Sequence, residues 1–156
     1  MRQAILPFRR EKIWMASVPI FGGIMNVVSM KISIDKDEAL HMLRKAKSAH
    51  IKWRSHAQGM VAGLDLAEDK TPVQHSDCAF GKWYYGAGQR ALGHYDLYDG
   101  IEAPHRILHQ IYGEIYHYIK KGKAEKAREK LPHLMEISRT LLEVIALLEQ
   151  EITAPG

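Results

Sequence analysis

The side chains best suited to chemistry in this chain are its single cysteine and its nine histidines. Cys78 follows Asp77 and opens the stretch CAFGKW. A lone cysteine cannot form an internal disulfide, so its thiol serves either as a small buried apolar group or as a metal-binding or reactive group. The residues in the rest of the chain must decide between these uses.

Three histidines lie in positions that suit a metal site. His105 and His109 are four residues apart in the stretch HRILH, which places both imidazoles on one helix face, where they could converge on one ion. His50 falls within the apolar stripe of another predicted helix, where a histidine is either a core residue or a ligand that points into a bundle. Neither feature is specific by itself, because histidine pairs also arise by chance in such a histidine-rich chain.

Together, His50, Cys78, His105 and His109 form a complete ligand set for zinc. Three imidazoles and one thiolate are borderline-soft donors, and four protein ligands fill the tetrahedral shell of Zn²⁺. A filled shell leaves no position for a reactive water, so the set argues against hydrolytic catalysis. His75 is the most plausible substitute ligand. We expect the histidines outside this set to face solvent or to lie in loops; they are His41, His56, His75, His94, His117 and His133.

Two predicted helices carry the three histidines. Residues 35–66 show helical periodicity with Asp35 as the candidate N-cap, and they include His50. A second helix is predicted from Ala103 or Pro104 to about Lys121, where Gly122 stops it. Cys78 follows a polar loop over residues 67–77. Ser76 or Asp77 can cap a short helix that begins at Cys78, and the positive helix end would then make the thiol more acidic.

The last helix has the clearest pattern, with apolar residues at alternating spacings of three and four, typical of a bundle seam. Pro132 should bend this helix or delay its start. Three long helices and the short Cys78 helix predict a mainly α protein with a four-helix-bundle-like domain over residues 36–153. The seam residues are Leu131, Leu134, Ser138, Leu141, Ile145, Leu148 and Ile152.

Residues 1–35 are predicted to form a separate N-terminal segment. Polar and apolar residues alternate over 28–34, which predicts a strand, and residues 13–20 with the glycines at 22 and 23 would complete a short β-hairpin. The uncharged run 13–30 superficially resembles a membrane anchor, but Pro19, Asn26 and the glycines interrupt it. We therefore favour the hairpin over a membrane anchor.

Composition narrows the functional classes. A chain of 156 residues suits one compact domain, and its net charge of +4 is mild. The basic run over 120–130 is interleaved with Glu and Ala, and no aromatic residues alternate with it, which argues against nucleic-acid binding. One cysteine favours a reducing cytoplasm over an oxidising compartment.

The sequence around the four predicted ligands resembles the chemoreceptor zinc-binding domain, abbreviated CZB, over roughly residues 36–152. The resemblance rests on AHIKW around His50, on CAFGKW, close to the family's C-x-[Leu/Phe]-G-x-W, and on HRILH. It implies that His50, Cys78, His105 and His109 bind zinc. It also implies that Phe80, Gly81 and Trp83 seat the short helix, with Gly81 permitting close approach.

In that family the domain reports cytoplasmic zinc, or oxidants such as hypochlorous acid, to an attached signalling module, and family members commonly dimerise through the bundle. No signalling hairpin or cyclase motif accompanies the domain here. The resemblance implies a cytoplasmic, non-enzymatic, homodimeric zinc regulator. Such a regulator either acts in trans on a partner such as a chemoreceptor or a diguanylate cyclase, or has zinc binding itself as its output.

Other functions remain open at this point. A purely structural zinc domain would need zinc to fold, whereas a thiol-based redox sensor would respond through Cys78. A di-iron or hemerythrin-like bundle would need further Glu and His ligands beyond an E-x-x-H pair such as Glu102 with His105, which has Pro104 inside it. A cysteine hydrolase would need a nucleophile signature, and none is recognisable around Cys78.

Overall fold

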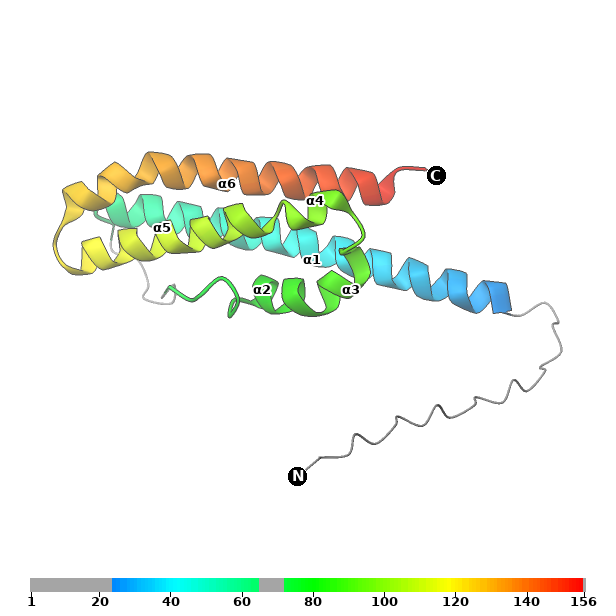
Figure 1. Cartoon of the computed structure of the whole chain (residues 1–156). Helices are drawn as coiled ribbons and strands as arrows, with labels where there is room; N and C mark the ends of the chain where they lie inside the picture. The colour runs from blue at the N-terminus through cyan, green and yellow to red at the C-terminus, as the bar shows by residue number, and fades with distance from the viewer. Residues whose placement is uncertain (1–23, 65–71, 156) are drawn as a thin grey trace, which may run out of the picture.

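The computed structural model describes residues 24–64 and 72–155, with the backbone alone for residues 24–35. Three long helices run side by side, α1 (Ile24–Val61), α5 (Glu102–Lys120) and α6 (Ala124–Thr153) (Figure 1). Between α1 and α5 lie α2 (Ala79–Trp83), a π-helical turn η1 (Tyr84–Gly88), α3 (Gln89–Leu92) and α4 (Asp96–Asp99). The predicted mainly α, bundle-like fold is confirmed, since the described residues contain helices and no strand.

Local sequence explains the α5–α6 hairpin. Pro104 lies in the first turn of α5, where its missing N–H breaks no helical hydrogen bond. Gly122 adopts a φ of 68°, and its N–H donates to the carbonyl of Ile119, which ends α5 as predicted. Pro132 lies inside α6, and the helix begins well before it at Ala124. Pro132 therefore does not delay the start of the helix, because its one lost hydrogen bond is outweighed by the packing of the seam.

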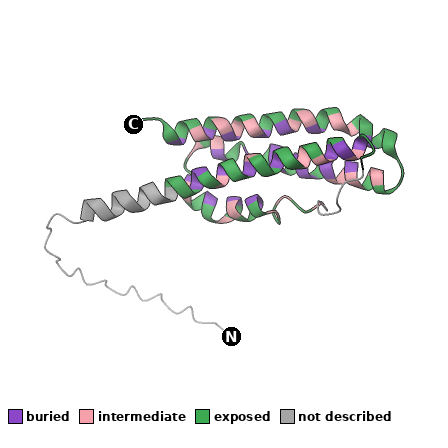
Figure 2. Ribbon diagram, turned by 180° about the vertical axis from the view of Figure 1, so that it is seen from behind, coloured by how far each residue is buried: buried purple, intermediate pink, exposed green. Residues whose placement is uncertain are grey.

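The core lies where the three long helices meet (Figure 2). The predicted seam of α6 is buried from Leu134 to Ile152, and Leu131 is half-buried. Burial of apolar side chains removes them from water and is the main force that holds the bundle together. Residues of the other two helices complete this core; they include Leu43, Ala46 and Ala57 of α1 and Leu108, Ile111 and Ile115 of α5.

The N-terminal prediction requires a correction. The backbone over residues 28–34 belongs to α1, so the predicted strand is wrong there, and Asp35 lies within the helix and does not cap it. An alternation of polar and apolar residues over seven positions is weak evidence for a strand. Residues 24–35 contain no Gly or Pro to interrupt a helix, so α1 extends through them and gains one hydrogen bond per added residue. Residues 13–20 and the glycines at 22 and 23 lie outside the described residues. The division between segments 1–35 and 36–153 stays a prediction.

The other end of α1 also differs from expectation. The helix ends at Val61, short of the predicted residue 66, and Gly63 follows with a φ of 77°. Leu64, which the predicted helix over residues 35–66 would have included, is exposed. Within the part of the chain that the structure describes, no helix is both long enough and apolar enough to span a membrane.

The short helical pieces are held together by two tyrosines. The rings of Tyr84 and Tyr98 stack with their centroids 4.5 Å apart. Each hydroxyl donates to the other residue's backbone carbonyl, at 3.1 Å from Tyr84 and 2.6 Å from Tyr98. Gly88 packs against this pair, since a Cβ there would meet the Tyr98 hydroxyl and the Trp83 ring. This packing holds the π-helical turn η1 against α4.

Candidate metal centre

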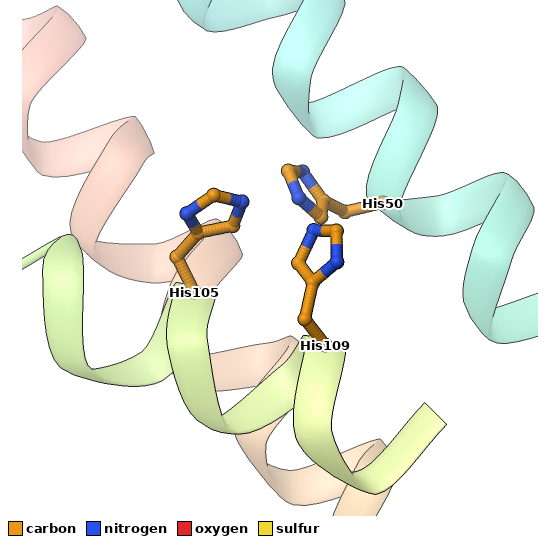
Figure 3. Close-up of side chains that lie close together, drawn as sticks. All are labelled: His50, His105 and His109. Atoms are coloured by element: carbon orange, nitrogen blue, oxygen red, sulfur yellow. The ribbon is translucent and has the colours of Figure 1, made fainter. Parts of the chain in front are cut away.

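Three buried histidines from two helices converge inside the bundle. His50 comes from α1, and His105 and His109 come from α5; one nitrogen of each lies within 4.8 Å of the other two. Figure 3 shows the three rings turned toward one another across the space between the helices. Their exposed fractions are 3%, 1% and 5%. The three imidazoles are therefore placed to share one metal ion.

The helices account for this convergence. His105 and His109 project from consecutive turns of α5, and their ring centroids are 4.8 Å apart. The ring of His50, on the buried stripe of α1, lies 5.0 Å from the ring of His105 and 5.9 Å from that of His109. The helix packing brings His50 to the α5 pair from a distant part of the sequence.

Backbone carbonyls set the orientation of two of the rings. Nδ1 of His50 lies 2.7 Å from the carbonyl oxygen of Ala46, and Nδ1 of His109 lies 2.9 Å from that of Val73. A carbonyl oxygen accepts but cannot donate, so both Nδ1 atoms carry the proton and both Nε2 atoms keep a free lone pair. Metal-binding histidines are commonly held in this way.

Cys78 lies beside the histidine cluster. Its Sγ atom is 3.5 Å from Nε2 of His105. It also accepts the N–H of Gly81 at 3.1 Å and donates to the carbonyl of His75 at 3.3 Å. Cys78 is thus itself the N-cap of α2, in place of the predicted Ser76 or Asp77. A sulfur in this extended position can reach the N–H three residues on, as a Ser or Asp oxygen would.

The distance between Sγ and Nε2 fits one shared zinc ion. Sulfur and nitrogen ligands lie about 2.3 Å and 2.0–2.1 Å from a tetrahedral Zn²⁺, so they lie about 3.5 Å from each other. Cys78 and His105 already have that separation. The cluster whose atoms all lie within 4.8 Å comprises the three histidines, and Cys78 contacts it through His105. The donor chemistry of these residues fits zinc, and the four-residue ligand set stays a prediction.

Burial keeps the imidazoles neutral. It lowers the pKa of His50 to about 4, although the bond to Ala46 opposes the shift. Burial, together with the neighbouring histidines, lowers the pKa of His105 to about 2. The pKa of His109 is also lowered by burial. Neutral imidazoles are the form that binds a metal.

The thiol behaves differently from our expectation. Burial raises the pKa of Cys78 above its usual value, and the backbone N–H groups of Gly81 and Phe80 oppose this only in part. The predicted acidification fails because α2 has just five residues and its dipole is small beside the cost of burying a thiolate. A bound cation would restore the thiolate, since a coordinating thiol is deprotonated.

Aromatic rings and one glycine complete the walls of the site. The ring of Phe80 meets His105 and His50 edge-on at 5.1 and 5.8 Å between centroids, and Trp53 lies 4.9 Å from His109. Gly81 permits close approach, as predicted, because a Cβ there would collide with the carbonyl group of His75. The sequence did not predict the contact of Trp53 with His109 or the roles of the His75 and Val73 carbonyls. Backbone groups and packing partners have no characteristic spacing in a sequence.

The remaining histidines mostly lie where predicted. Exposed positions are occupied by His41, His94, His117 and His133. His56 is half-buried on α1, and its Nδ1 lies 3.0 Å from the hydroxyl of Tyr112. His75 is half-buried in the loop before α2, with its ring centroid 5.9 Å from that of His105.

Comparison with known families supports the same interpretation. Residues 50–128 match the family described as the chemoreceptor zinc-binding domain. Neither the curated proteins nor the solved structures gave a match. The matched range spans about half of the chain and contains all four predicted ligands, from His50 through Cys78 to His105 and His109. The chain therefore belongs to the chemoreceptor zinc-binding domain family.

Proposed function

We propose that this protein is a zinc-responsive regulator that holds one Zn²⁺ between His50, Cys78, His105 and His109. The observation that carries the proposal is the convergence of three buried imidazoles, with the thiol of Cys78 3.5 Å from His105. Family membership supports the choice of zinc among metals. When bound, zinc supplies a cross-link between α1, α5 and the start of α2, and the four residues leave no open position for catalysis.

The signalling role rests on the family. Chemoreceptor zinc-binding domains are associated with signalling proteins, so we propose that this chain reports zinc to a chemoreceptor or a diguanylate cyclase in trans. Cys78 is half-buried, which leaves the thiol partly accessible and supports an additional response to oxidants such as hypochlorous acid. The lone cysteine supports a cytoplasmic location.

Metal content and affinity test the zinc site. The full-length protein, purified without added metal, should contain one zinc per chain by elemental analysis. Ala substitution of any of the four ligands should weaken zinc binding strongly, because three ligands no longer close the shell. His94→Ala is the matched control, because it removes an exposed histidine outside the cluster. The site is wrong if all four variants retain full zinc and wild-type affinity.

Folding of the metal-free protein separates a regulator from a structural zinc domain. The three ligand histidines are not among the apolar side chains of the core, and Cys78 only packs against its edge, so the apo protein should keep its helical circular dichroism and should exchange zinc reversibly. Loss of helical signal on chelation would instead establish a structural role. Binding of a chemoreceptor or a diguanylate cyclase to the zinc-loaded protein, but not to the apo protein, would support the proposed action on that partner.

We also propose that the protein is a homodimer, as family members commonly are. Multi-angle light scattering of the full-length chain at micromolar concentration should give twice the chain mass of 17.8 kDa. A monomeric mass in both the apo and the zinc-loaded states would remove this proposal and leave the metal site unaffected.

A further inference from the structure

A cavity of about 530 Å³ opens beside the metal centre. Its lining includes the imidazoles of His117, His75 and His109, together with Arg106, Gln74 and Gln110. The three imidazoles differ in burial: His117 is exposed, His75 is half-buried and His109 is 5% exposed. They therefore form a series of metal-binding side chains that leads from solvent to a residue of the centre itself.

The two outer histidines each keep a nitrogen available. Nδ1 of His117 lies 2.6 Å from the carbonyl oxygen of Gly113, so this nitrogen carries the proton and Nε2 keeps its lone pair. Nε2 of His75 lies 3.1 Å from the hydroxyl of Tyr85. That hydroxyl donates its single proton to Oε1 of Glu102, so its oxygen accepts from His75, whose Nδ1 keeps a lone pair.

We propose that this cavity is the route by which Zn²⁺ reaches and leaves the centre, and that His75 is a transient ligand on that route. The inference rests on the proposed zinc site and adds a mechanism for exchange. His75 suits the role because it lines the cavity, lies 5.9 Å from His105 between ring centroids, and precedes Cys78 by three residues in the loop before α2. A passing ion would exchange its waters for imidazoles one at a time before it meets His109.

Arg106 provides an electrostatic signature of the route. Among the described residues that line the cavity, its guanidinium carries the formal charge, because the others are imidazoles, amides and apolar groups. A positive charge beside the path repels an approaching cation and should slow its association. Removal of this charge should therefore speed zinc uptake, which an effect on folding alone would not produce.

The test measures zinc association and dissociation rates on the full-length apo protein, by stopped flow with a fluorescent zinc indicator. His75→Phe keeps the ring and removes the ligand atoms. We expect both rate constants to fall about tenfold, which corresponds to about 1.4 kcal/mol in the barrier, with an unchanged Kd. An equal fall in the association and dissociation rate constants is expected of a residue that lies on the path. His94→Phe is the control and should change neither rate constant.

Arg106→Gln is the second arm, measured at an ionic strength of about 0.01 M, where charges act over about 30 Å. We expect a faster association that converges with the wild type as salt is added. Two results for His75→Phe would overturn the route: unchanged rate constants in both directions, or a higher Kd that comes from faster dissociation alone. A result in which Arg106→Gln does not speed zinc association would overturn it as well. A wild-type protein that binds no zinc would overturn the proposed function itself, so the two failures are distinguishable.

Discussion

The carbonyl group of His75 occupies the space where a side chain at Gly81 would begin. The two residues lie on either side of Cys78, whose sulfur accepts the N–H of Gly81 and donates to the carbonyl of His75. The absent Cβ therefore permits the close loop that holds the sulfur next to His105.

Gly81→Ala should disrupt the metal centre without removing a ligand. The added Cβ would push the His75 backbone away and shift Cys78, so we expect zinc affinity to fall by about tenfold to a hundredfold, as for other changes around a metal ligand. Competition with a chelator of known affinity measures the effect. Gly86→Ala is the matched control, because a Cβ at Gly86 meets nothing within 4 Å. Equal affinities in the two variants would contradict this account of the loop.

Zinc binding should release one proton per ion near neutral pH. The imidazoles of His50 and His105, with pKa values of about 4 and 2, are already neutral at pH 7, whereas burial raises the pKa of the Cys78 thiol. The thiol must lose its proton to bind, so the logarithm of the affinity should rise by about one per pH unit between pH 6.5 and 8. Calorimetry in buffers of different ionisation enthalpy counts the protons, and Cys78→Ser should abolish the release.

The metal-free protein should lose stability as the pH falls below about 6.5. The unfolded chain protonates His50 near its ordinary pKa of 6.5, but the folded chain does so only near 4. Between these values the unfolded state binds more protons, so the free energy of unfolding falls by about 1.4 kcal/mol per pH unit for each such histidine.

Chemical denaturation of the apo protein at several pH values measures this dependence. His50→Gln should make it shallower, while the exposed-site variant His94→Gln should leave it unchanged. A wild-type stability that stays constant from pH 7 to 5 would show that the buried histidines take up protons without unfolding.

Ser138→Ala should stabilise the protein. Ser138 is fully buried in the α6 seam, and its hydroxyl has no hydrogen-bond partner among the described residues. Removal of this hydroxyl relieves the cost of burying an unsatisfied polar group, so we expect a gain of about 1 kcal/mol in the free energy of unfolding. Thermal and denaturant unfolding measure the gain, and a loss of stability would show that the hydroxyl has a partner in solution.

Hypochlorous acid should release zinc through Cys78. The Cys78 thiolate attacks the chlorine of HOCl and displaces hydroxide, and water then hydrolyses the sulfenyl chloride to a sulfenic acid and chloride, so the site would lose its soft ligand. A colorimetric chelator follows the release, and circular dichroism should show intact helices. A Cys78→Ser variant that still loads zinc should release it far more slowly. An equal rate in that variant would remove Cys78 as the oxidant sensor.

Much of the fold could be predicted from the sequence because it is local. The spacing of apolar residues in α5 and α6 predicts which face of each helix is buried. Gly122 ends α5 because glycine tolerates a positive φ. Where the signal was short, prediction failed. The alternation over residues 28–34 indicated a strand, but an uninterrupted helix extends through it.

The sequence by itself determined the identities of the candidate ligands, since residue type sets donor chemistry and the spacing of His105 and His109 sets their common face. The tertiary structure decided what those ligands can do. It brings His50 to the α5 pair, turns the ring of His109 through a carbonyl from a distant loop, and makes burial outweigh the helix dipole at Cys78. Those effects depend on distances between segments far apart in the chain, and a pattern read along the chain contains no such distance.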